Sequence, residues 1–399
     1  MKTISAIKVA ILSASNYITV LVNTVLFPIF PVMAQALNLT LRDLAILVGI
    51  VSFPSALINL GGGILADRFG KKIIIVLSLT LYGLGGLLAG LSIILMEEPY
   101  PVILVGRLFQ GIGAATPMFL SVALVGDIFQ SLERSKALGF LETANGLGKV
   151  TSPILGALIG LITWYSIFFI YPIVALPVAI ATWKVIEEPN ENKGVDWEKQ
   201  KKAFRQFKDE SRIITLLVAF LVIFILIGTM FWLSDFLEAR LELNQILRGV
   251  VISLPALAML LTTLFAERIH NKLNPRFIMG GGLILTSACL IGIYHTLETI
   301  LFWPLIVALG VGAGIVLPSV DMVSTSVEIK EIRGVMSTIY GSARSLGGAT
   351  TTITFSYLLE YGLQLTFYSI AVGGIIVGLI VLFRMNEKKL LPKELLPDK

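Results

Sequence analysis

The sequence predicts an all-α integral membrane protein with twelve transmembrane helices, arranged as two six-helix pseudo-symmetric bundles. Three observations support this fold class: the composition, the placement of Lys and Arg, and a repeat at an offset of about 200 residues. Of the 399 residues, 56% are hydrophobic and only 14% are charged, whereas soluble domains carry about 25% charged residues. A bilayer accommodates so much apolar sequence, because each spanning helix needs roughly 20 apolar residues.

The apolar segments end at charges, Pro/Gly clusters or short polar turns. Runs of this length need a backbone that bonds within one segment, which predicts helices rather than strands. Lys2 and Lys8 precede the first run, which has no small-residue cleavage site, so we expect a retained helix. The spans are predicted near 8–36, 43–66, 73–95, 101–127, 136–161, 164–186, 213–237, 246–266, 276–295, 299–326, 334–359 and 363–384.

Lys and Arg are distributed very unequally between the two sides of the predicted membrane. With both termini on one side, that side collects 25 of the 31 Lys and Arg residues, and the opposite side has only Arg42, Arg240 and Arg248. The positive-inside rule therefore predicts an even number of spans with both termini in the cytoplasm. We expect a multi-pass protein of the cell membrane.

One sizeable polar segment divides the chain into similar halves. Within it, Trp197, Phe204 and Phe207 recur among lysines, as in a short amphipathic helix lying on the inner leaflet. The predicted organisation is an N-terminal bundle (1–186), a cytoplasmic linker (187–212), a C-terminal bundle (213–386) and a cytoplasmic tail (387–399).

The two halves resemble each other at equivalent positions. Because six helices per half is an even number, the repeats run parallel, related by an axis along the membrane normal. The matched pairs are 65–68 with 265–268, 111–113 with 310–312, Pro117 with Pro318, and 147–148 with 346–347.

The turn between the second and third spans reads GILADRFGKK at 63–72. A tight turn between packed helices needs glycine, here Gly63 and Gly70, where chains approach or φ is positive. Asp67 is free to face a helix N-terminus or an arginine, while Arg68 and Lys71 stay at the anionic surface. From the residues alone, a charged turn and a conformational element are both open.

This string resembles, position by position, the loop signature G-x-L-a-D-r-x-G-r-k of the major facilitator superfamily. In that family the loop acts as a latch that joins the halves when the transporter is open outward. The resemblance implies a latch built from Gly63, Asp67, Arg68, Gly70 and Lys71, with Asp127 and Arg134 beyond the fourth span. Such a network is worth about 1–3 kcal/mol, enough to bias a rocking equilibrium.

Further motifs resemble the twelve-span drug:proton antiporter branch. They are the R-x-x-q-G-x-g-a-a pattern from Arg107 to Ala115 and the P-x-x-P of Pro28 and Pro31. The antiporter motif G-x-x-x-G-P-x-x-G-G is incomplete in the fifth span. It keeps its helix-packing residues, while Ser152 and Ala157 replace glycines with small residues that still permit close helix contact. The residues kept are Gly148, Pro153 and Gly156.

Charges inside spans are expensive and need a reason. The resemblance links Arg107 to proton coupling, and a structural arginine bonded to carbonyls is equally open. Glu142 and Lys149 lie roughly 10.5 Å apart on one helix face. They either neutralise each other through Asn145 or water, or Glu142 exchanges a proton and Lys149 is a counter-ion for an acidic substrate.

Asp321 has no basic neighbour in sequence and follows Pro318, where we expect a kink, and this combination indicates a water-filled cavity. A proton or substrate-cation role is favoured for it. Arg344 is a plausible partner from the next span, and a satisfied ion pair would make both structural. Asp235 ends the seventh span, where solvation at the outer surface is the simpler interpretation and a substrate contact is the other.

The chain has no metal-ligand cluster, phosphate-binding loop or catalytic triad, so we expect no cofactor, no metal, no ATP hydrolysis and no enzyme. The net charge of +5 reflects membrane topology rather than nucleic-acid binding. The resemblance implies a proton-coupled exporter of hydrophobic or amphipathic compounds that works by alternating access. Its partners would be a small-molecule substrate, protons and the bilayer, and we expect a functional monomer. A specific transporter of a metabolite, siderophore, sugar or lipid, and a non-transporting sensor, are the alternatives.

Overall fold

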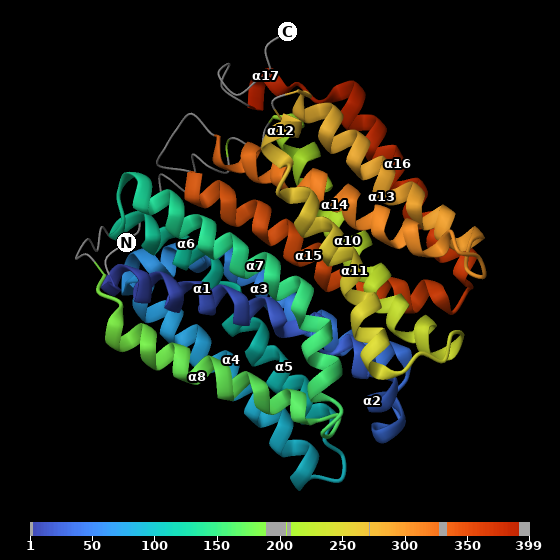
Figure 1. Cartoon of the computed structure of the whole chain (residues 1–399), viewed down its shortest axis with the longest axis horizontal. Helices are drawn as coiled ribbons and strands as arrows, with labels where there is room; N and C mark the ends of the chain where they lie inside the picture. The colour runs from blue at the N-terminus through green and yellow to red at the C-terminus, as the bar shows by residue number, and fades with distance from the viewer. Residues whose placement is uncertain (1–2, 189–204, 206–208, 271, 327–332, 391–399) are drawn as a thin grey trace. The chain divides into compact units, whose positions relative to one another are not determined.

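The structure, a computed structural model, describes residues 3–188, 205, 209–270, 272–326 and 333–390. Most of the predicted linker, including Trp197, Phe204 and Phe207, lies outside the described residues, as does the end of the predicted tail. All the regular elements among the described residues are helices (Figure 1).

The first half of the chain forms eight α-helices and one 3₁₀ turn among its described residues. Figure 1 shows α1 beside α7, and α4 beside α8, pairs that are in contact. The elements are α1 (Thr3–Thr24), η1 (Phe27–Ile29), α2 (Phe30–Leu37), α3 (Leu41–Phe69), α4 (Lys71–Leu95), α5 (Tyr100–Ala115), α6 (Pro117–Ile128), α7 (Ser131–Ile159) and α8 (Ser166–Val185).

The second half repeats this arrangement of long helices with short connections. Its described elements are α10 (Glu210–Ala239), α11 (Gln245–Thr263), α12 (Ala266–His270), α13 (Pro275–His295), α14 (Phe302–Thr325), α15 (Arg333–Leu359), α16 (Leu363–Arg384) and α17 (Glu387–Leu390). Contacts divide the chain into two compact units. Unit 1 holds α1 to α8 together with 233–253, the end of α10 and the start of α11, while unit 2 holds the remaining helices.

Prolines interrupt two of the predicted spans. The sequence predicts one helix over 8–36, whereas the structure has α1, η1 and α2, with Pro28 and Pro31 in the first turns of the second and third segments. The span predicted over 101–127 is likewise two helices, because Pro117 begins α6 directly after Thr116. Proline lacks the N–H that continues a helix and is tolerated in a first turn.

Among the described residues, ten segments are long and apolar enough to cross a membrane. The helices at the fifth and eleventh predicted spans, α7 and α15, are less apolar than these ten. The first carries Glu142 and Lys149, and the second carries Arg344 among Ser, Thr and Gly residues. Polar residues inside a span face the protein interior or a water-filled cavity rather than lipid. With these two helices, the chain has the predicted twelve-helix membrane fold.

Glycines let α1 and α7 touch through their backbones. A Cβ on Gly156 would lie 1.8 Å from the Val25 carbonyl oxygen, and one on Gly148 would lie 3.1 Å from that of Tyr17. Helices in a bilayer associate by close packing, for which small residues are needed. The backbone of Pro153, between the two glycines, packs against Gly249 of α11. The retained residues of the incomplete motif are therefore all at helix contacts.

The same contacts recur in unit 2, which gives the sequence repeat a structural meaning. Gly347 of α15 faces the Phe220 carbonyl of α10, as Gly148 faces Tyr17 in unit 1. A second matched pair of glycines makes another helix contact in each unit. Gly111 of α5 lies against the Val51 carbonyl of α3, and Gly310 of α14 lies against the Pro255 carbonyl of α11. Equivalent glycines therefore make equivalent helix contacts in the two halves.

Replacing Gly156 by alanine should destabilise the protein, because the new methyl group overlaps a backbone oxygen that has no room to move. Overpacking of this kind costs about 1–3 kcal/mol. Gly139→Ala on the same helix is the matched control, since nothing lies within 4 Å of a Cβ there. We expect the apparent Tm of the purified protein in detergent to fall for Gly156→Ala only. Equal values for the two variants would contradict this account of the contact.

Candidate functional site

Arg107 lies on α5 and is fully buried inside unit 1. Its Nη1 donates to the Val22 carbonyl at 2.7 Å and to Gln110 Oε1 at 2.8 Å. Its Nη2 donates to Asn23 Oδ1 at 2.7 Å, and its Nε donates to the Leu47 carbonyl at 3.3 Å. Each of these acceptors is uncharged, so the guanidinium is solvated by oxygens of α1, α3 and α5. The geometry describes a charge that ties three helices together, and its role in proton coupling stays a prediction.

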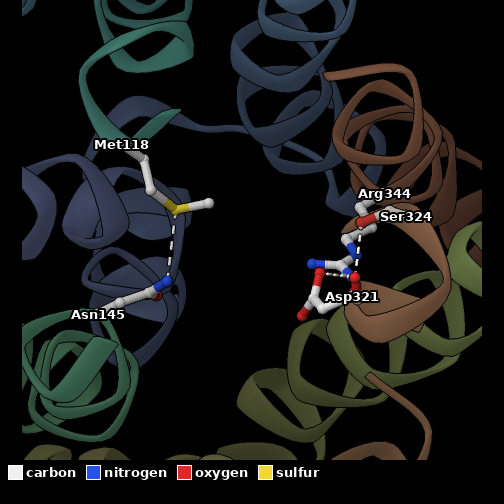
Figure 2. A network of polar contacts seen from close by, with 5 residues as sticks. All are labelled: Met118, Asn145, Asp321, Ser324 and Arg344. Atoms are coloured by element: carbon white, nitrogen blue, oxygen red, sulfur yellow. Dashed lines mark hydrogen bonds and ion pairs between the residues drawn. The ribbon is translucent and has the colours of Figure 1, made fainter. Parts of the chain in front are cut away.

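Asp321 and Arg344 form an ion pair between α14 and α15 in unit 2 (Figure 2). The Arg344 Nη2 donates to Asp321 Oδ1, and the Ser324 hydroxyl donates to the Asp321 carbonyl at 2.8 Å. The Asp321 side chain is 57% exposed, whereas that of Arg344 is 21% exposed. The partner suggested by the sequence is therefore present, and the carboxylate is open to solvent about one turn from the end of α14.

Asn145 lies on α7 in unit 1, where its Nδ2 donates to the sulfur of Met118 at 3.3 Å (Figure 2). Its Oδ1 is buried and has no hydrogen-bond partner among the described residues. Asn145 stands three residues before Gly148, and Arg344 stands three residues before Gly347. The repeat thus puts a neutral amide in one unit where the other unit has a cation.

Three other predicted residues differ in their exposure. Glu142 on α7 is exposed, Lys149 on the same helix is half-buried, and Asp235 near the end of α10 is exposed. Near Asp235, Glu238 forms an ion pair with Arg248 of α11. The exposure of Asp235 fits solvation at a membrane surface, and the transport roles of all three stay predictions.

The loop between α3 and α4 lies at the basic end of unit 1, by which we mean the end where α1 begins. Lys71 Nζ forms an ion pair with Asp127 Oδ2 of α6 at 2.8 Å. The Arg68 guanidinium sits over the Phe69 ring, 5.2 Å from its centroid. The side chain of Asp67 lies outside the described residues. Lys71 and Asp127 are therefore in contact inside unit 1, and their role in a latch stays a prediction.

Arg134 and Gly63 are two further residues of the predicted latch, and the structure describes the surroundings of Arg134 only. Arg134 of α7 reaches over to α6, where its Nη2 would lie 3.2 Å from a Cβ on Gly126. Gly63 lies inside α3, and its surroundings are outside the described residues. Whether the loop joins the two units stays a prediction.

Gly70 meets Glu188, a residue that the sequence motif did not single out. Gly70 has φ +92°, a conformation that L side chains rarely adopt, and a Cβ on it would lie 2.9 Å from Glu188 Oε2. The Lys71 and Lys72 amides donate to the two carboxylate oxygens of Glu188 at 2.8 and 3.0 Å. This carboxylate caps the positive end of α4. In the sequence, the position of Glu187 and Glu188 directly after the sixth apolar span could have indicated this contact.

The neighbouring acid, Glu187, ties α8 to α1. Lys8 Nζ donates to Glu187 Oε2 at 3.0 Å, and this hydrogen bond, with the charge of Lys8, lowers the pKa of the Glu187 carboxyl. Glu187 and Glu188 together form what we call the acidic clasp, which joins the end of the sixth predicted span to the starts of the first and third.

Unit 2 has a corresponding set of contacts. Glu387 pairs with Arg276 at the start of α13 at 3.5 Å, and Arg384 pairs with Glu210 at the start of α10 at 3.2 Å. The Asn386 amide also donates to the Ser211 hydroxyl at 3.0 Å. Each unit therefore joins its sixth helix to its first and third helices through polar contacts at one end.

Two repeated sets of membrane-spanning helices, with ionised side chains held inside the spans, define a multi-pass membrane transporter. The comparison with known protein families gives the same class. A model of the Major Facilitator Superfamily matches residues 12–352. The chain belongs to the major facilitator superfamily.

Relatives of the chain include an exporter and a drug-resistance protein. The bacillibactin exporter of Bacillus subtilis (strain 168) is 29% identical over 386 residues, which cover 95% of this chain and 96% of that protein. The quinolone resistance protein NorA of Staphylococcus aureus is 25% identical over 165 residues, 41% of each chain. The inward-facing crystal structure of a bacterial homologue of the human lysosomal transporter Spinster matches with a TM-score of 0.80 at 15% identity, covering 98% of this chain and all of that one. This last likeness shows the fold.

Replacing Glu188 by alanine should destabilise unit 1, because two amides at the start of α4 lose a charged acceptor. Loss of such a cap costs about 1–2 kcal/mol. Glu187→Ala is the matched control, since it removes the adjacent acid and an exposed ion pair. We expect a lower apparent Tm for Glu188→Ala and little change for Glu187→Ala. A larger effect of the control would show that the ion pair, not the cap, matters.

Proposed function

We propose that this transporter is a proton-driven exporter of hydrophobic or amphipathic compounds that works by alternating access. The observation that carries the proposal is the Asp321 carboxylate on α14. A carboxylate inside a span needs compensation, which Arg344 supplies, yet more than half of its side chain is exposed. Such a group is accessible to protons and to substrate alike.

Competition at this carboxylate would couple the two flows. A proton and a cationic or hydrogen-bonding group of the substrate both act on Asp321, so that each displaces the other. Two other ionisable groups lie close to this part of α14. Arg344 approaches from α15, and His270 on α12 contacts Ser319 through Nε2 at 2.7 Å.

The remaining sequence candidates take supporting roles in this proposal. Glu142, exposed on α7, is the second proton site, and Arg107 holds α1, α3 and α5 in place around unit 1. Both termini face the cytoplasm, the chain acts as a monomer in the plasma membrane, and the loop motif around Asp67 works as the latch. The likeness to the bacillibactin exporter supports the outward direction.

An imposed pH gradient should drive substrate movement in proteoliposomes, and Asp321→Asn should abolish that dependence. A difference of one pH unit supports about tenfold accumulation at one-for-one exchange. The measurement is uptake of ethidium with and without the gradient. Glu133→Gln, at an exposed acid early in α7, is the control and should behave as wild type. Gradient-driven uptake that survives in Asp321→Asn would exclude this carboxylate as the coupling site.

Export of one defined metabolite, such as a siderophore, is the second candidate. The match to the bacillibactin exporter favours it, because that match runs along nearly the whole chain, whereas the match to the quinolone resistance protein covers less than half. The half-buried Lys149 and the incomplete motif of the fifth span also suit a dedicated substrate.

Ligand-stabilised melting separates the two candidates. A multidrug exporter should show small Tm increases, of a degree or two, with many chemically unrelated compounds. A dedicated exporter should show one large increase with one class, since a ligand present at about 100 times its Kd adds roughly 2.7 kcal/mol of stability. A panel of siderophores, cationic dyes, quinolones and sugars on the purified protein provides the measurement.

A further inference from the structure

We propose that unit 1 binds an anionic phospholipid on the outer face of α4 and α8, with the lipid phosphate held by Lys72 and Lys184. Lys72 stands in the first turn of α4, and its Nζ lies over the ring of Trp183 on α8, 5.0 Å from the centroid. Trp183 is 54% exposed, and the next residue along the chain, Lys184, is exposed as well. Two lysines and an amphipathic ring therefore stand at the same end of two packed helices, at the basic end of the unit.

The charge of these two lysines is not neutralised by an ion pair within the described residues. The nearby acids have hydrogen-bond partners other than the two ammonium groups: Glu187 pairs with Lys8 and feels the charge of Lys72 as well, and Glu188 accepts from the amides of Lys71 and Lys72. Basic residues are also disfavoured in the first turn of a helix, where the helix dipole is positive. An external anion at this place would relieve both effects.

Below the lysines, the same two helices present an apolar strip. Ile73 and Leu77 of α4 and Ile180 of α8 are exposed, and α4 and α8 pack side by side (Figure 1). Leu77 lies about one turn further from the basic end than Lys72 on α4, and Ile180 lies about one turn further from it than Trp183 on α8. This combination of cations at an interface and an adjoining apolar strip matches one molecule that carries both a phosphate and acyl chains.

Unit 2 contains the equivalent face, which serves as an internal comparison. There the Arg276 guanidinium lies over Phe277 on α13, 4.7 Å from the ring centroid, and Arg384 of α16 follows Phe383, which is 83% exposed. Both arginines are paired with acids, Arg276 with Glu387 and Arg384 with Glu210. The aromatic and apolar features recur while the cations are neutralised, so the anion preference belongs to unit 1.

Thermal unfolding of the full-length protein in detergent tests the site. Added phosphatidylglycerol should raise the apparent Tm more than the same concentration of phosphatidylcholine. In the double variant Lys72→Gln/Lys184→Gln, half-maximal stabilisation should require at least about fivefold more phosphatidylglycerol, since each interfacial Lys contributes about 1 kcal/mol toward anionic lipid. The matched control, Lys136→Gln/Lys272→Gln, removes two exposed lysines elsewhere in the chain.

Equal losses in the two double variants would overturn the site in favour of general attraction by net charge. A wild-type protein that responds equally to both lipids would overturn the anion preference altogether. A second readout covers variants that fold poorly: brominated phosphatidylglycerol should quench the part of the tryptophan emission that Trp183→Phe removes, and brominated phosphatidylcholine should quench it less. Equal quenching by both lipids contradicts the proposal.

Discussion

Close contact between helix backbones is the constraint on which the rest of this structure depends. In a bilayer the hydrophobic effect does not drive helices together, and the backbone polar groups of a helix must be hydrogen-bonded within that helix. Helices therefore associate where small residues let them approach. Gly148 against the Tyr17 carbonyl and Gly347 against that of Phe220 are such places. Because the same contact is built in both units, the two halves keep one fold although few of their side chains agree.

Ionised side chains are placed on this frame in two different ways. Arg107 is surrounded by neutral oxygens from three helices and has no exposed surface, so its charge serves to hold helices. Arg344 pairs with the Asp321 carboxylate, and its Nε is buried without a hydrogen-bond partner among the residues that the structure describes. A charge with few partners beside an exposed acid is suited to change its partner during transport, whereas a fully solvated one is not. The two intramembrane arginines therefore differ in their chemistry.

The repeat is symmetric in packing and asymmetric in charge. Asn145 and Arg344 occupy equivalent positions, so the fold does not require a charge there, and the cation in unit 2 serves another purpose. The charged residues at the basic end also differ between the units: Arg276 and Arg384 are paired with acids, while Lys72 and Lys184 form no ion pair within the described part of the chain. The proposed proton coupling and the proposed lipid binding each use a charge that one unit has and the other lacks or neutralises. Charge substitutions on a shared helical scaffold provide this difference.

The sequence by itself determined the class of fold, because apolar length, Lys and Arg placement and the loop motif are local properties of the chain. It also located the ionised residues inside spans, since a charge among apolar residues is visible without coordinates. Only the tertiary structure decided their partners. Arg107 bonds residues from 22 to 110, Asp321 meets Arg344, and Glu188 caps a helix that begins at Lys71. These contacts join positions far apart in sequence, and the proline breaks at Pro28 and Pro117 likewise depended on how neighbouring helices accommodate the freed backbone groups.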